Sequence, residues 1–100
     1  MCKNDFFNHI LTVVECETEV GREILQGPMI KTREAVDARY LLIYFLNHFA
    51  GFDSSYIARA LGMTPQGVRK IINAFDDRRK QSGKIFEITF QRIKNTLETD

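Results

Sequence analysis

Apolar residues recur at three- and four-residue steps along most of the chain, and this spacing predicts helices. The stretch "DFFNHILTVVEC", residues 5–16, carries them on one broad face, with Asn4 or Asp5 available as the N-cap. The following "GREILQG" predicts a short second helix that Gly27 and Pro28 end, and "MIKT" is expected to be a loop.

The strongest helical pattern extends from Arg33 to Phe49, and Gly51 stops it. Its apolar surface is wide because leucines and aromatic residues flank the stripe on both sides. The residues that form this surface are Val36, Tyr40, Leu41, Leu42, Ile43, Tyr44, Phe45, Leu46 and Phe49. We therefore expect this segment to be the central and most buried helix.

Two helices joined by a sharp turn are predicted next. Asp53 can cap a short helix over 54–61, and Gly62 ends it. Thr64 followed by Pro65 marks a helix start, because proline at the first helical position lacks an N–H that would be unpaired anyway. This helix is expected to run to about Lys80 and to be supported by a pair between Asp76 and Lys80, one helical turn apart.

The last segment, "IFEITFQRIKNTL", predicts a closing helix after the turn "QSGK". Its β-branched and aromatic start leaves a strand over 85–90 as an alternative. The residues expected to face inward are Ile85, Phe86, Ile88 and Ile93. The pattern as a whole predicts an all-α fold, a five- or six-helix bundle in a single domain over residues 1–100.

Composition narrows the class of protein. The chain has 100 residues, 44% of them hydrophobic and 27% charged, which is ordinary for one globular domain. It has no apolar run near the roughly 18 residues that a membrane span needs, and its start does not resemble a signal peptide. Cys2 and Cys16 are too few for a disulfide framework, so a cytoplasmic location is expected.

The formal net charge of +1 conceals a separation of charge along the chain. Residues 1–37 contain four basic and seven acidic residues, whereas residues 54–85 contain seven basic and two acidic ones. A local basic stripe is typical of nucleic-acid-binding proteins. The alternative is a basic helical face that only contacts solvent.

The segment "SYIARALGMTPQGVRKII", residues 55–72, meets the requirements of a helix-turn-helix over about 54–80. A small residue, Ala58, lies where the two helices must approach, and Gly62 can adopt the positive φ of the turn. Apolar residues occupy the other required places, namely Ile57, Leu61, Met63, Val68 and Ile71. An ordinary two-helix hairpin is the alternative.

If those apolar residues are buried, the outer face of the second helix is fixed by the helical period. Gln66 could pair with adenine and Arg69 with guanine in a major groove, while Gly67 would let the backbone approach a phosphate. Lys70 and Arg59 are better placed for phosphates, which position the protein without specifying sequence, and Arg78 and Arg79 are further candidates for such contacts. The candidate DNA-binding face of the helix thus comprises Thr64, Gln66, Gly67, Arg69, Lys70 and Asn73.

From about residue 14 to residue 75 the chain resembles the C-terminal DNA-binding domain of the bacterial replication initiator DnaA. The residues that carry this resemblance are "KTREAVDARYLLIYFLNHFAGFDSSYIARALG", with "VVECETEVGREIL" before them. The resemblance implies a Trp-repressor-like helical fold that binds double-stranded DNA in replication or transcription control. It also implies a minor-groove or backbone contact from Lys31 or Arg33, and a phosphate contact from Arg39.

The recognition turn departs from that family. Where the family has a characteristic "grDHtTV", this chain has "MTPQGV", one residue shorter and without the aspartate–histidine pair that reads bases. The origin-box specificity is therefore not carried over. The chain also has no GxxxxGK loop, so the resemblance is to the DNA-binding module alone.

Other chemistry finds little support. His9 and His48 have no partners at metal-ligand spacing, and no enzyme, metal, cofactor or small-molecule substrate is predicted. The second hypothesis for function is a helical protein-interaction module that has lost DNA binding. An exposed apolar patch could then bind a partner or form a homodimer, with Phe6, Phe7 and Ile10, or Phe86 and Phe90, as its candidate residues.

Overall fold

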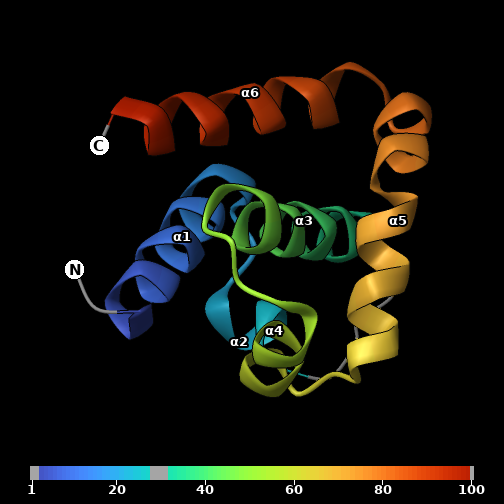
Figure 1. Cartoon of the computed structure of the whole chain (residues 1–100). Coiled ribbons are helices and arrows are strands. Elements are labelled where there is room, and N and C mark those ends of the chain that lie inside the picture. Colours follow the sequence, from blue (N-terminus) through green and yellow to red (C-terminus); the bar gives the residue numbers. More distant parts are fainter. Residues whose placement is uncertain (1–2, 28–31, 100) are drawn as a thin grey trace.

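Helix α3 (Arg33–Tyr44) runs through the middle of the molecule, and the other helices are arranged around it (Figure 1). Both α1 (Lys3–Thr18) and α5 (Pro65–Gln81) pack against α3. The last helix, α6 (Gly83–Thr99), crosses over α1 and contacts the end of α5. The prediction that the segment beginning at Arg33 is central is confirmed.

Two shorter helices complete the fold at the opposite edge from α6. The four-residue α2 (Arg22–Leu25) packs against α3, and α4 (Ser54–Leu61) packs against α5. In this computed structural model, which describes residues 3–27 and 32–99, the chain is a compact all-α globule of six α-helices without a strand. Because residues 85–90 lie within α6, the alternative of a strand there is wrong.

The helix boundaries follow from local capping. Asp53 accepts a hydrogen bond from the N–H of Tyr56 at 2.7 Å, and Thr64 accepts one from the N–H of Gly67 at 3.1 Å. Gly62 ends α4 in the left-handed conformation, with φ of 67°. These boundaries of α4 and α5 agree with those predicted from the sequence. The predicted N-cap of α1 is wrong, because the helix begins at Lys3 and includes both Asn4 and Asp5.

The left-handed conformation also follows α1, but there it is adopted by Glu19, with φ of 57°. The N–H of Glu19 donates to the carbonyl of Glu15 at 2.9 Å and closes the last turn. Glycine or asparagine is usual at such a position because a Cβ makes the conformation costly, by roughly 1–2 kcal/mol. A glutamate is therefore held in a strained conformation at this corner.

The predicted helix over 33–49 changes its geometry near its end. After α3, residues Phe45–Phe49 form a π-helical segment, η1, in which the N–H of Ala50 donates to the carbonyl of Phe45 at 3.1 Å. The side-chain amide of Asn47 then donates to the carbonyl of Phe52 at 2.9 Å and holds the following turn. The wider turn directs the chain toward α4.

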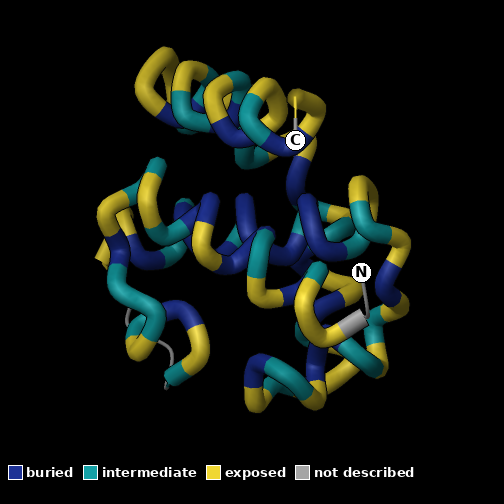
Figure 2. Tube along the Cα trace, turned by 90° about the vertical axis from the view of Figure 1, so that its left-hand side faces the viewer, coloured by how far each residue is buried: buried dark blue, intermediate teal, exposed yellow. Residues whose placement is uncertain are grey.

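One hydrophobic core contains residues from all six helices. On α6 the buried residues are Phe86, Phe90, Ile93 and Leu97, which follow the helical period. In Figure 2 the buried stretches of α6 lie on the side of this helix that faces the rest of the bundle. Ile85 and Ile88 were predicted to face inward, but they are 82% and 51% exposed. The prediction is wrong because neither position falls on the stripe that the four buried residues define.

The apolar residues proposed as a partner surface are mostly buried. Phe7, Ile10, Phe86 and Phe90 belong to the core, and Phe6 is half-buried against it. They cannot form the exposed patches expected from the sequence. Among the described residues, the large apolar side chains that are exposed are instead Phe49, Ile85 and Ile88.

Candidate nucleic-acid interface

The pair α4–α5 is built as the sequence pattern predicts. Ala58 is buried where α4 meets α5, and the N–H of Met63 donates back to the Ala58 carbonyl at 2.8 Å. The inner residues of the two helices are buried, namely Ile57, Leu61, Val68, Ile71 and Phe75. This packing fixes which face of α5 points away from the protein.

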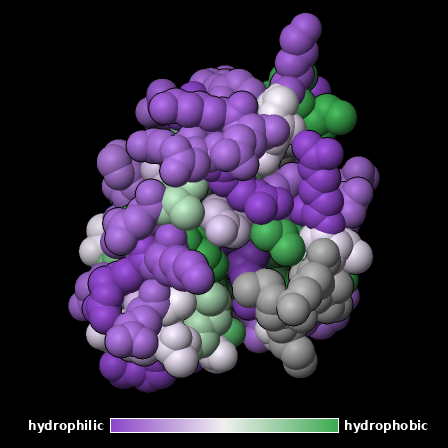
Figure 3. Space-filling view, turned by 90° about the vertical axis from the view of Figure 1, so that its right-hand side faces the viewer, coloured by the Kyte–Doolittle hydropathy of each residue, from purple (hydrophilic) through white to green (hydrophobic). Residues whose placement is uncertain are grey.

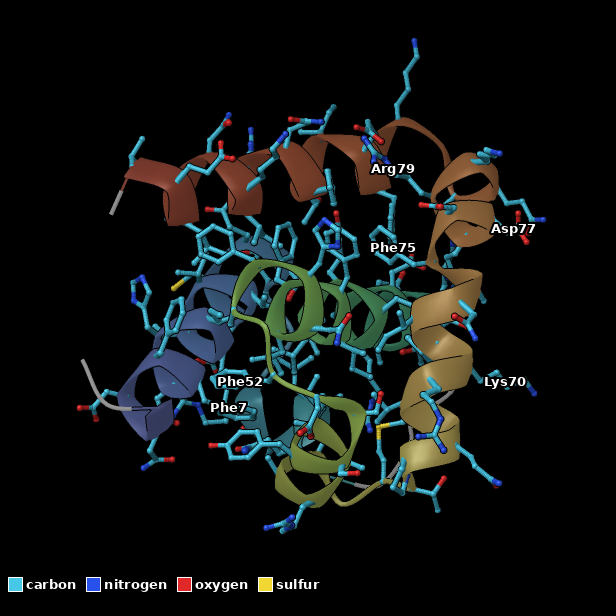
Figure 4. All side chains as sticks on the ribbon, in the orientation of Figure 1. Phe7, Phe52, Lys70, Phe75, Asp77 and Arg79 are labelled. Atoms are coloured by element: carbon cyan, nitrogen blue, oxygen red, sulfur yellow. The ribbon has the colours of Figure 1, made fainter. Side chains whose placement is uncertain are left out.

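The outward face of α5 carries polar and basic side chains. Gln66, Arg69, Lys70 and Asn73 are all exposed, and together with Asp77 they line a shallow, open depression. Figure 4 shows Lys70 and Asp77 pointing away from the protein, and the face around α5 is predominantly hydrophilic in Figure 3. Within the described residues, neither Arg69 nor Lys70 has an ion-pair partner, so both charges remain available to a ligand.

Thr64 and Gly67 are joined by the hydrogen bond that caps α5. Thr64 is exposed, whereas Gly67 is half-buried. A Cβ added at Gly67 would lie 3.1 Å from the Thr64 Oγ1, which is a tight approach. The cap thus gives a structural reason for a small residue at position 67. Arg59 is exposed in the last turn of α4 rather than on α5.

Arg33 lies at the other end of α5. Its Nη2 donates to the carbonyl of Ser82 at 3.0 Å, and its Nε lies 3.9 Å from a carboxylate oxygen of Asp37. Ser82 follows Lys70 by twelve residues, a distance of about 18 Å along a helix. The structure therefore does not bring Arg33 together with the outward residues near the start of α5. Lys31 lies outside the described residues.

Arg39 is buried, with 3% of its surface exposed. Its Nη2 donates to the carbonyls of Ile24 and Gly27 at 2.7 and 3.0 Å, so the guanidinium holds the end of α2 against α3. Burial lowers the pKa of this guanidinium. The expectation of a phosphate contact from Arg39 is wrong because the side chain points into the protein and its Nη2 is engaged there.

Arg78 and Arg79, the further candidates for phosphate contacts, instead form ion pairs within the protein, so that prediction is wrong. Arg78 donates to Asp37 of α3 at 2.7–2.8 Å, and its guanidinium lies 4.9 Å from the centre of the Tyr40 ring. Arg79 makes two bonds to Glu87 of α6, at 2.6 and 2.7 Å. Asp37 and Glu87 both lie outside residues 54–85, so these pairs neutralise two of the segment's seven basic charges.

The hydrogen bonds from Arg79, with a further one from Gln91, lower the pKa of Glu87 to about 2. The Arg79 guanidinium also lies 4.2 Å from the centre of the Phe90 ring. In Figure 4 it points from α5 toward α6, whereas Phe75 points toward the core. Arg79 therefore joins α5 to α6.

Asp77 was missing from the predicted site. It follows Asn73 by one helical turn, so the spacing alone places it on the same face. Its carboxylate would repel phosphates, which limits the basic part of the outward face to the first half of α5.

No known protein family, curated protein or solved structure matches the chain. A search of the described residues also finds no group of histidine, cysteine and acidic side chains suited to a metal ion. None of the described helices is long and apolar enough to cross a membrane.

Proposed function

We propose that the chain binds double-stranded DNA, with α4 and α5 acting as a helix-turn-helix and the first half of α5 entering the major groove. The observation that carries this proposal is the outward stripe of Gln66, Arg69, Lys70 and Asn73, whose basic members have no ion-pair partner among the described residues. Residues near the start of a recognition helix are the ones that reach base edges.

Four exposed side chains have a role in this proposal. Arg69 donates to guanine, and Gln66 pairs with adenine through its side-chain amide. Lys70 and Arg59 bind phosphates, which fix the orientation of the protein on the duplex. Arg39, Arg78 and Arg79 take no part, because they stabilise the fold.

The resemblance to the DnaA C-terminal domain suggests a Trp-repressor-like arrangement and a role in replication or transcription control. Those assignments rest on the sequence resemblance alone. Because Arg33 lies near the end of α5, the proposal does not require the second, minor-groove contact that the resemblance implies.

The first test is a titration of fluorescent duplexes at several salt concentrations. One duplex carries a DnaA-type box and the other a scrambled sequence. With about two to four phosphates contacted, the logarithm of the association constant should fall against the logarithm of salt with a slope of about −2 to −4. A difference between the duplexes would indicate sequence reading.

Variants separate the roles of the outward residues. Arg69→Ala should weaken binding to the preferred duplex by about tenfold or more and relax discrimination, because it removes a base contact. Lys70→Ala should weaken all duplexes alike and flatten the salt slope. Lys94→Ala removes the same charge from an exposed position on α6 and serves as the control.

Two outcomes would overturn the proposal. One is a loss of affinity in Lys94→Ala equal to that in Arg69→Ala, which would mean that the charge acts without a defined site. The other is an absence of binding at low salt, which would favour a protein-interaction module.

A further inference from the structure

A groove of about 470 Å³ lies away from the start of α5, between the end of α1 and the beginnings of α3 and α6. Ala38 and Leu41 of α3 and Phe86 of α6 line its apolar part, and all three belong to the core. The groove therefore reaches the hydrophobic interior of the bundle. Its position places it at the opposite end of α5 from Gln66 and Arg69.

Ile85 stands at this groove with most of its side chain in water. A fully exposed isoleucine loses the free energy that burial would provide, about 1.5–3 kcal/mol. Ile88 is also exposed on α6, but it does not line the groove. Both isoleucines are thus exposed on α6, but only Ile85 lines the groove. Ile88 therefore provides a matched control for Ile85.

The polar lining of the groove is predominantly acidic. It contains four carboxylates and two basic side chains, which gives a formal net charge of −2. Of the carboxylates, Asp37 is already paired with Arg78. The other three, Glu17, Glu19 and Glu34, have no ion-pair partner among the described residues.

Glu19 is the residue held at positive φ after α1. A glycine would adopt this conformation without strain, yet the position carries a carboxylate beside the groove. Strained residues of this kind often lie at binding sites. The strain is consistent with a binding role for the Glu19 side chain and adds to the argument from charge and apolar surface.

We propose that this groove binds a basic segment of a partner protein. An apolar side chain of that segment packs against Ile85 and the apolar wall, while lysines or arginines beside it pair with Glu17, Glu19 and Glu34. This recognition mode combines an apolar anchor with charge complementarity. It does not depend on DNA binding, which uses the other end of α5.

The lack of an apolar anchor beside the exposed basic residues of α5 argues against a second copy of the chain as the occupant. The outward face of α5 supplies exposed basic residues, but within the described part of the chain it has no large exposed apolar side chain to serve as the anchor. The exposed isoleucines of α6 are themselves at or near the groove. A partner of different sequence, basic and with an apolar anchor, fits better.

The probe is a fluorescein-labelled peptide of about twelve residues, with two leucines one helical turn apart and lysines around them. Two matched peptides replace the leucines by serine or the lysines by glutamate. Saturable binding of the first peptide, at a Kd of about 10–100 μM, is expected from a groove of this size. The two matched peptides should not saturate over the same range.

Variants of the protein locate the contact. Ile85→Ser should weaken binding about tenfold, and the double change Glu19→Gln with Glu34→Gln by a similar factor. Ile88→Ser makes the same apolar-to-polar change, and Glu98→Gln removes one carboxylate charge, at exposed positions of α6 outside the groove. Each should change affinity by less than about twofold. Circular dichroism confirms that each variant is folded.

The proposal fails if no saturable binding occurs, or if Ile88→Ser weakens the peptide as much as Ile85→Ser does. Sedimentation of the protein without peptide tests whether a second copy of the chain occupies the groove instead. A dimer that Ile85→Ser dissociates would show that a second copy fills the groove, and it would overturn the assignment to a basic partner. DNA affinity should be the same in Ile85→Ser as in the unmodified protein.

Discussion

The two halves of α5 use arginine in opposite ways. In the first half, Arg69 is exposed and has no ion-pair partner among the described residues. In the second half, Arg78 and Arg79 are half-buried and paired with Asp37 and Glu87. Arginine is therefore available to a ligand in the first half of the helix, whereas in the second half it holds the helix to α3 and α6.

This difference shows why the net charge of a sequence segment can overstate the positive charge that the folded protein presents to a ligand. The two acidic partners come from α3 and α6, so residues 54–85 contribute less positive charge to the surface than their composition indicates. Asp77 reduces it further on the outward face. What remains is a short basic stripe near Arg69 and Lys70, and its extent can be tested.

The largest loss of stability is expected from a substitution at Phe75, where the two halves of α5 meet. The Phe75 ring stacks on Tyr44 at 4.2 Å and contacts Phe86 and Phe90. Phe75→Ala should lower the free energy of unfolding by about 3–5 kcal/mol, because it leaves a cavity in the core. Urea unfolding measures this change. Asn73→Ala, on the outward face, should change it by less than about 0.5 kcal/mol.

The second prediction compares the arginines directly. Arg78→Met should lower the free energy of unfolding by about 1–2 kcal/mol, because Asp37 loses its closest partner in a half-buried site. Arg69→Met, the same change two and a half turns earlier, should leave stability within about 0.5 kcal/mol. Equal losses in thermal denaturation would contradict the division between the two halves.

Asp77→Asn should strengthen DNA binding by about two- to fivefold at low salt, because it removes a repulsive charge from the outward face. The gain should disappear as added salt screens the charge. Glu98→Gln on α6 provides the control of equal charge in the same anisotropy assay. A gain in both variants would mean that net charge alone sets the affinity.

The smallest change in stability is expected from the ion pair between Arg79 and Glu87, which joins α5 to α6 and depends on pH. Because the pKa of Glu87 is lowered from 4.5 to about 2, its ion pair contributes stability above pH 4.5 and loses it as the pH falls toward 2. Glu87→Gln should therefore be less stable than the unmodified protein near neutral pH, by a small margin since the pair is partly exposed. The difference between the two proteins should shrink as the pH falls from 4.5 and disappear below about pH 2, as measured by urea unfolding.

Local features of this fold could be predicted from the sequence, whereas features set by distant contacts could not. Asp53, Gly62 and Thr64 act on backbone groups within a few residues, so their roles as caps were correctly predicted. Ile85 and Ile88 were placed inward because they are apolar, although the stripe defined by Phe86 and Phe90 excludes them.

The prediction of the candidate site was likewise correct for local features and wrong where distant contacts decide. The helical period correctly placed Gln66 and Arg69 on an exposed face. Arg39 was assigned to phosphate because the sequence does not show that its side chain reaches the carbonyls of Ile24 and Gly27. The pairing of Arg78 with Asp37, 41 residues apart, likewise depends on how α3 and α5 pack.

The buried Arg39 also affects how the protein unfolds locally. A four-residue helix such as α2 does not persist alone, yet its end is joined to α3 through two charge-assisted hydrogen bonds. Breaking these bonds would leave a buried cation without acceptors, so α2 and α3 should open as one cooperative unit. Amide hydrogens in the short turn would then exchange with solvent as slowly as those at the centre of the bundle.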